Sequence, residues 1–67
     1  MKISAKTIEE VLGILNKRFK NRNTEWEYDD NIDYFVCIEE DDEGITENHY
    51  SYVFDENELC FTLKHEF

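Results

Sequence analysis

The sequence contains no proline and only two glycines, Gly13 and Gly44, in 67 residues. Flexible linkers are rich in glycine and serine, and stiff linkers are rich in proline. Because neither composition occurs anywhere in the chain, we expect one compact domain over residues 1–67. Its core is small, although ten aromatic residues compensate in part, since each ring buries roughly 150–250 Å².

Cysteines are also few. Cys37 and Cys60 are the two that the sequence contains, too few for the disulfide framework of a small secreted domain. No apolar run approaches the roughly 20 residues that span a bilayer, and no apolar signal segment follows Met1. We therefore expect free thiols, no membrane contact and a cytoplasmic location, which is the host cytoplasm if the chain is encoded by a phage.

Basic residues are nearly missing from the second part of the chain. Residues 1–22 carry six basic and two acidic side chains, a net charge of +4, whereas residues 23–67 carry Lys64 against fifteen carboxylates, a net charge of −14. The sequence therefore joins a basic N-terminal segment to a strongly acidic remainder.

The N-terminal segment has the pattern of an amphipathic helix. Thr7 and Glu10 stand at the spacing of a capping box. Apolar residues then recur on one helical stripe at Ile8, Val11, Leu12, Leu15 and Phe19. This pattern predicts a helix over residues 7–21. The preceding residues 1–5 fit either an extended arm or an early helical turn capped by Ser4.

The acidic remainder alternates apolar and polar residues as strands do. The alternation predicts strands over 24–29, 33–40, 46–54 and 59–66, and therefore an α+β fold with one N-terminal helix packed on one face of a four-stranded antiparallel meander. We expect the face under the helix to carry Tyr34, Val36, Ile38, Tyr50, Tyr52, Phe54, Leu59, Phe61 and Leu63.

The predicted turns set the register of each hairpin. Glu56 and Asn57 as a two-residue loop place Phe54 opposite Leu59, and residues 42–44 as a three-residue loop give Gly44 the left-handed position. A three-residue loop at 30–32 puts Trp26 on the face of Tyr34. A two-residue loop at 30–31 instead sends Trp26 to the other face, beside Phe35. We prefer the three-residue loop.

No motif of a known catalytic centre is present. The sequence lacks a glycine-rich phosphate loop, an HExxH helix, a CxxC pair and a Gly-x-Ser-x-Gly elbow, so we expect a protein that is not an enzyme and has no cofactor. Cys37, His49, Cys60 and His65 match no standard zinc spacing, and we expect no metal site. The net charge of −10 also argues against direct binding to nucleic acid, despite the basic cluster at residues 17–22.

The carboxylates themselves are the strongest functional indication. Carboxylates at alternate positions of a strand lie about 6–7 Å apart, since each residue rises roughly 3.3 Å, and this is broadly the spacing of successive phosphates along a nucleic-acid strand. Such a surface attracts a basic channel that handles nucleic acid. The alternative is that the charges keep a small sheet protein soluble and guard its edges. The residues that we expect to contact a basic partner, a nuclease or a nucleoprotein complex, are Glu25, Glu27, Asp29, Asp30, Glu39, Glu40, Asp41, Asp42, Glu43, Asp55, Glu56 and Glu58.

A second interaction surface follows from the same predicted sheet. Phe35, Cys37, Val53 and Cys60 are expected on the face away from the helix, where they would form an apolar patch. A contiguous exposed patch indicates an interface. The alternative function is therefore a homodimeric structural or accessory subunit that associates through these residues.

In size, in charge and in the absence of a catalytic motif, the chain resembles the acidic inhibitors that phages and mobile elements use against host nucleases, including anti-CRISPR and anti-restriction proteins. It is similar in the same respects to acidic immunity proteins and antitoxins that neutralise basic nucleases. The resemblance is one of charge and size, and it implies occlusion of a basic partner by nucleic-acid mimicry.

Overall fold

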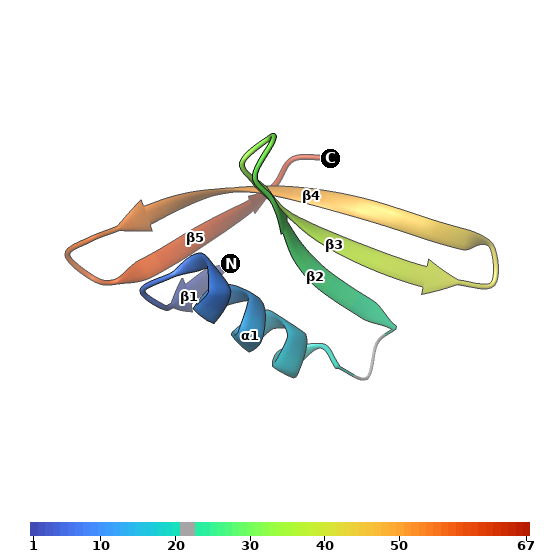
Figure 1. Cartoon of the computed structure of the whole chain (residues 1–67), viewed down its shortest axis with the longest axis horizontal. Coiled ribbons are helices and arrows are strands. Elements are labelled where there is room, and N and C mark those ends of the chain that lie inside the picture. The colour runs from blue at the N-terminus through green and yellow to red at the C-terminus, as the bar shows by residue number, and fades with distance from the viewer. Residues whose placement is uncertain (21–22) are drawn as a thin grey trace.

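The computed structural model describes residues 1–20 and 23–67, and it has the α+β architecture that the sequence predicts, with five strands in place of four. The strands form one curled antiparallel sheet in the order β1-β5-β4-β3-β2 (Figure 1). The elements are β1 (Lys2–Ser4), α1 (Ile8–Arg18), β2 (Thr24–Asp29), β3 (Tyr34–Asp41), β4 (Gly44–Asp55) and β5 (Cys60–His65).

The additional strand is β1. It pairs with β5 so that Ile3 lies opposite Phe61, and the Ala5 N–H donates to the Leu59 carbonyl (3.1 Å). The residues before the helix therefore form an extended segment and not an early helical turn. Three residues with one apolar side chain, Ile3, show too little alternation to predict a strand. Pairing with β5 and burial of Ile3 stabilise the segment.

Helix α1 begins as the sequence predicts. Thr7 is the N-cap, and its hydroxyl accepts from the Glu10 N–H (3.1 Å). Val11 and Leu15 are fully buried against the sheet. The helix ends at Arg18, three residues before the predicted end at residue 21, which lies outside the described residues.

The register of β3 is the main correction to the predicted sheet. Asp41 pairs with Gly44, so the connecting loop has two residues and not three. Because successive side chains of a strand point to opposite faces, a shift of one residue turns the whole strand over. Phe35 and Cys37 consequently lie in the core under the helix, whereas Tyr34 lies on the other face.

The loop of the first hairpin has neither of the two predicted lengths, but Trp26 lies on the face that one of the two predictions gave it. Tyr28 lies opposite Phe35, and the loop has four residues, 30–33. Trp26 therefore shares the face of Phe35, as the two-residue alternative implied. Asp33, the last residue of the loop, adopts a left-handed conformation (φ 58°) that Asp tolerates better than most residues.

The last hairpin has the predicted faces in a different register. Phe54 lies opposite Phe61 and Tyr52 opposite Leu63, two residues away from the predicted pairing. Leu59 belongs to the loop, has positive φ (52°) and is 42% exposed. A shift of two residues preserves the face of every side chain, so Phe61 and Leu63 lie in the core as predicted, whereas the prediction of Leu59 in the core was wrong.

Candidate functional site

The chain folds into an elongated body with an acidic projection at one end. The principal-axis extents are 42 × 24 × 17 Å, and the β3–β4 and β4–β5 turns lie at opposite ends of the long axis (Figure 1). Within β4, residues 50–55 pair with β5. The first part of β4 extends past the end of β5, and there, among the described strands, β4 pairs with β3 alone. We call residues 39–47 the acidic arm.

Every residue of the acidic arm is exposed. Asp41 shapes the turn, because its Oδ1 accepts from the Glu43 N–H (2.8 Å), and Asn48 donates its side-chain amide to Glu39 Oε1 (3.3 Å). Between described residues, the ion pairs are Lys2 with Glu58 (3.7 Å) and His49 with Glu47 (3.9 Å). The carboxylates at 39–43 therefore form no ion pair with the described part of the chain, and their negative charge is available to a partner.

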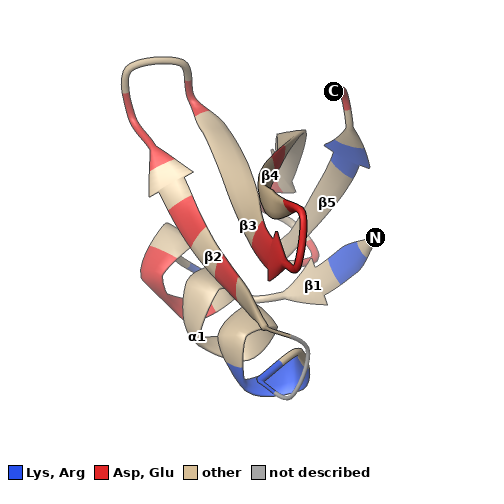
Figure 2. Ribbon diagram, turned by 90° about the vertical axis from the view of Figure 1, so that its right-hand side faces the viewer, with Lys and Arg blue, Asp and Glu red and all other residues tan. Residues whose placement is uncertain are grey.

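The structure brings a second group of predicted residues near the arm. Figure 2 shows acidic residues along β2 and at the end of β3, and basic residues on β1, β5 and the end of α1. A shallow cavity of about 220 Å³ lies against Val36 and Ile38, and the carboxylates lining it are Glu27, Asp29, Asp30 and Glu47. The position of Glu47 beside β2 was not predicted from the sequence, because it depends on the register of both hairpins.

The remaining acidic residues of the prediction do not join these groups. Glu25 is exposed on β2, but it does not line this cavity. Asp55 and Glu56 lie at the opposite end of the long axis, where Asp55 Oδ1 accepts from the backbone N–H groups of Asn57 (2.9 Å) and Glu58 (3.2 Å). Glu58 pairs with Lys2. Because Asp55 and Glu56 lie at the opposite end of the long axis from the acidic arm, one contact surface cannot include both groups equally.

The predicted apolar patch does not form. Phe35 (0% exposed) and Cys37 are buried in the core under α1, and Cys60 is also buried. Val53 alone of the four is exposed, at 70%. The placement of Phe35 and Cys37 on the outer face was wrong, because the two-residue β3–β4 loop turns β3 over.

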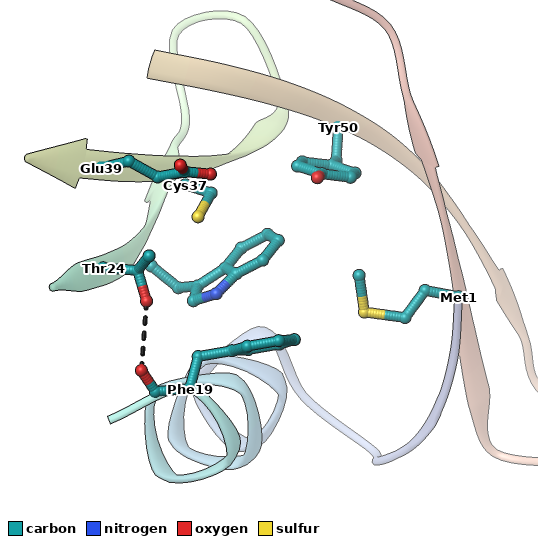
Figure 3. A pocket seen from close by; sticks show the side chains of 7 residues that line it. Met1, Phe19, Thr24, Cys37, Glu39 and Tyr50 are labelled. Carbon is teal, nitrogen blue, oxygen red and sulfur yellow. Dashed lines mark hydrogen bonds between the residues drawn. The ribbon is translucent and has the colours of Figure 1, made fainter. Parts of the chain in front are cut away.

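Three aromatic rings enclose a pocket between the end of α1 and the sheet. Its volume is about 310 Å³, and in Figure 3 the rings of Phe19 and Tyr50 lie on opposite sides of it, with the Met1 side chain on a third side. Ring centroids of Phe19 and Trp26 are 6.0 Å apart, and those of Trp26 and Tyr50 are 5.0 Å apart. This aromatic pocket is lined by Met1, Phe19, Thr24, Trp26, Cys37, Glu39 and Tyr50.

The titratable groups of the aromatic pocket differ in charge. Burial, and then the nearby Glu39 carboxylate, raise the pKa of the Cys37 thiol. Burial is also the main reason why the pKa of Tyr50 is raised. Both groups are therefore neutral near pH 7, and Glu39 supplies the negative charge.

A hydrogen-bonded group of two tyrosines and one carboxylate lies elsewhere on the helix side of the sheet. Tyr28 and Tyr52 both donate their hydroxyls to Asp33 Oδ1, Tyr52 at 2.8 Å. The Tyr28 bond, followed by the Tyr52 bond, lowers the pKa of Asp33. Because Asp33 accepts both bonds in its left-handed conformation, this group holds the first hairpin against β4.

Residues 1–20 and 23–67 contain no helix long and apolar enough to cross a membrane. The same residues contain no group of three His, Cys, Asp or Glu side chains placed to hold a metal ion.

Comparison with known proteins gives no relative: no protein-family model, no curated protein and no solved structure matches the chain.

Proposed function

We propose that the chain is a non-catalytic binding protein that occludes a basic, nucleic-acid-handling surface of a partner protein with its acidic arm. The single observation that carries the proposal is the position of residues 39–43. These five consecutive carboxylates are exposed at the end of a projecting hairpin and form no ion pair with the described residues.

The shape of the arm supports this reading. Paired strands hold alternate carboxylates about 6–7 Å apart, which is broadly the spacing of phosphates along a strand of nucleic acid. Beyond Glu40 the arm is two strands wide, and its tip lies at the end of the 42 Å long axis (Figure 1). A projection of this width fits a positively charged channel, and its charge raises the rate of encounter with such a channel.

The acidic cavity beside β2 extends the same surface. Glu27, Asp29 and Asp30 come from β2 and its loop, and Glu47 comes from the arm. A basic surface that receives the arm therefore meets a second row of carboxylates behind it.

The class of protein that this proposal favours is an inhibitor of the anti-CRISPR or anti-restriction type, carried by a phage or mobile element and acting in the host cytoplasm. An immunity protein or antitoxin for a basic nuclease would use the same surface against a different partner.

The proposal is tested by capture of partners from a lysate of the source cell at low and at high salt, followed by mass spectrometry. The bait is compared with the triple variant Glu40→Gln, Asp42→Asn, Glu43→Gln. A control with the same change in net charge, Glu9→Gln, Glu56→Gln, Glu66→Gln, neutralises exposed residues outside the arm.

We expect a basic nuclease or nucleoprotein that is retained by the wild type and by the control, and that is lost with the arm variant and at high salt. Purified partner should then lose its nucleic-acid binding or cleavage when the wild-type chain is added. Retention of the partner by the arm variant at high salt contradicts the proposal.

A further inference from the structure

The aromatic pocket is placed beside the acidic arm, and the two share a residue. Glu39 belongs to the arm and also lines the pocket, together with Trp26 and Tyr50. Figure 3 shows its side chain directed along β3 toward Cys37, on the side where the rings lie. A partner that covers the arm as far as Glu39 therefore contacts a residue of the pocket wall.

The walls of the pocket suit a flat cation. The faces of aromatic rings attract cations whose centres lie within about 6 Å of the ring centroid. Phe19 and Tyr50 stand on opposite sides of the pocket, and the indole of Trp26 is close to both rings, at centroid distances of 6.0 and 5.0 Å. Trp26 is only 4% exposed, so the core holds this ring in place, and the ring surface open to a cation belongs mainly to the half-buried Phe19 and Tyr50.

The charge of the side chains that line the pocket favours a cation over an anion, although the buried Trp26 Nε1–H is a donor without a hydrogen-bond partner in the described part of the chain. Among the described residues that line it, Glu39 has the one charged side chain. The Thr24 hydroxyl donates its proton to the Phe19 carbonyl (3.2 Å), which leaves the hydroxyl oxygen as an acceptor. The ammonium group of Met1 donates to the Leu63 carbonyl on β5 (3.1 Å).

The dimensions limit the occupant to one small group. A volume of about 310 Å³ lies at the lower end of the roughly 300–1,000 Å³ of small-molecule sites. A guanidinium fits the chemistry better than an ammonium, because it is planar, stacks on aromatic faces, is more weakly hydrated and forms paired hydrogen bonds with a carboxylate.

We propose that the aromatic pocket binds the guanidinium group of an arginine side chain that the basic partner presents beside the acidic arm. This inference rests on the proposed function for the source of the arginine, but the affinity of the pocket for a guanidinium is measurable without any partner.

The test uses the fluorescence of Trp26, the one tryptophan in the sequence, which lines the pocket and therefore reports on its occupant. The protein is titrated with Nα-acetyl-arginine methylamide at constant ionic strength. The neutral isostere Nα-acetyl-citrulline methylamide is the ligand control. Choline is titrated separately to examine a free quaternary ammonium as the alternative source of the cation.

Two variants with equal change in net charge complete the test. Glu39→Gln removes the carboxylate of the pocket, whereas Glu40→Gln changes the neighbouring residue, which does not line the pocket. Both residues are exposed, and far-UV circular dichroism verifies that each variant is folded.

We expect saturable binding of the arginine derivative with Kd on the order of 1–10 mM, and no saturation with the citrulline derivative. In Glu39→Gln the affinity for the arginine derivative should fall by about fivefold or more, whereas in Glu40→Gln it should not. Equal responses to arginine and citrulline, or no saturable response to either, overturn the proposal. Saturation by choline without saturation by the arginine derivative overturns the assignment to arginine. If the titration is negative but a basic partner is captured through the arm, this inference fails while the proposed function stands.

Discussion

The side-chain amide of Asn16 pairs with both backbone polar groups of Trp26. Asn16 Oδ1 accepts from the Trp26 N–H (2.8 Å), and Asn16 Nδ2 donates to the Trp26 carbonyl (3.1 Å). β2 is an edge strand, so these groups of Trp26 have no strand to pair with on that side. One helix residue therefore does at this position what a neighbouring strand would do, and it fixes α1 against the edge of the sheet.

Replacing Asn16 tests this connection. In Asn16→Ala, both partly buried groups of Trp26 lose their partners, and we expect a loss of about 1–2 kcal/mol in the free energy of unfolding. Urea denaturation followed by circular dichroism measures the loss. The exposed neighbour Lys17 is the control, and Lys17→Ala should change the free energy by less than about 0.5 kcal/mol. If both variants have the same stability as the wild type, the Asn16 bonds have no net effect.

The orientation of β3 is testable with two apolar residues of opposite exposure. Phe35 is fully buried, and Phe35→Ala should cost about 3–5 kcal/mol, which is comparable to the total stability expected for a chain of this size. Val53 is 70% exposed, and Val53→Ser should change stability by less than about 0.5 kcal/mol. Dispersion of amide signals in NMR spectra distinguishes a folded variant from an unfolded one. A folded Phe35→Ala variant would contradict the observed register.

The β3 orientation also shows where prediction from sequence failed. Residues 34–38 read Tyr-Phe-Val-Cys-Ile and are apolar on both faces, so the strand itself gives no alternation that selects one face. Its loops decide, and they depend on the left-handed conformation of Asp33 and on the two-residue turn after Asp41. In β2 and β4, by contrast, strong alternation made the faces of Trp26 and Tyr52 predictable relative to their own polar neighbours.

The aromatic pocket could not be predicted for a different reason. It combines Phe19 from the end of α1, Trp26 from β2 and Tyr50 from β4, and their meeting depends on the registers of two hairpins. In the sequence each of the three has the spacing of an ordinary core residue. The acidic arm was easier to recognise, because residues 39–43 are adjacent in the chain.

The hydrogen bonds to Asp33 predict a dependence of stability on pH. Its pKa is lower in the folded state than in the unfolded chain, so the contribution of Asp33 is present above the unfolded value of about 3.9 and is lost as the pH falls through the folded value. Asp33→Asn retains the tolerance for positive φ but removes the charge. We expect this variant to be less stable than the wild type near neutral pH, and the difference to shrink below pH of about 3.9. A difference that is independent of pH would show that the charge of Asp33 does not contribute.

The same group predicts a change at alkaline pH. Its hydrogen bond to Asp33 is the largest cause that raises the pKa of Tyr28, and the same applies to Tyr52. Stability from these bonds is therefore complete below the unfolded tyrosine pKa of about 10 and is lost as the pH rises through the folded values. Ultraviolet titration should show two of the four tyrosines ionising later in the wild type than in Asp33→Asn. Identical titration curves would exclude the bonds in solution.

The two cysteines should be protected from thiol reagents. Cys37 and Cys60 are free and buried, and the pKa of Cys37 is raised, which lowers its thiolate fraction. We expect modification by Ellman's reagent at neutral pH to be at least about tenfold slower in the native protein than in urea. The variants Cys37→Ala and Cys60→Ala assign each phase. Rapid modification of Cys37 in the native protein would show that the aromatic pocket opens far enough to admit the reagent.

The acidic arm should destabilise the fold that carries it. Residues 39–43 repel one another and the acids of β2, and no described residue forms an ion pair with them. The variant Glu40→Gln, Asp42→Asn, Glu43→Gln should therefore be more stable than the wild type at low ionic strength, by about 0.5–1 kcal/mol for the three charges together. Sodium chloride screens the repulsion, so it should stabilise the wild type more than the variant until the two converge. Denaturation in urea at several salt concentrations measures both effects. If neutralisation lowered the stability at low salt, the carboxylates would be structural, and the argument that their charge is available for a partner would fail.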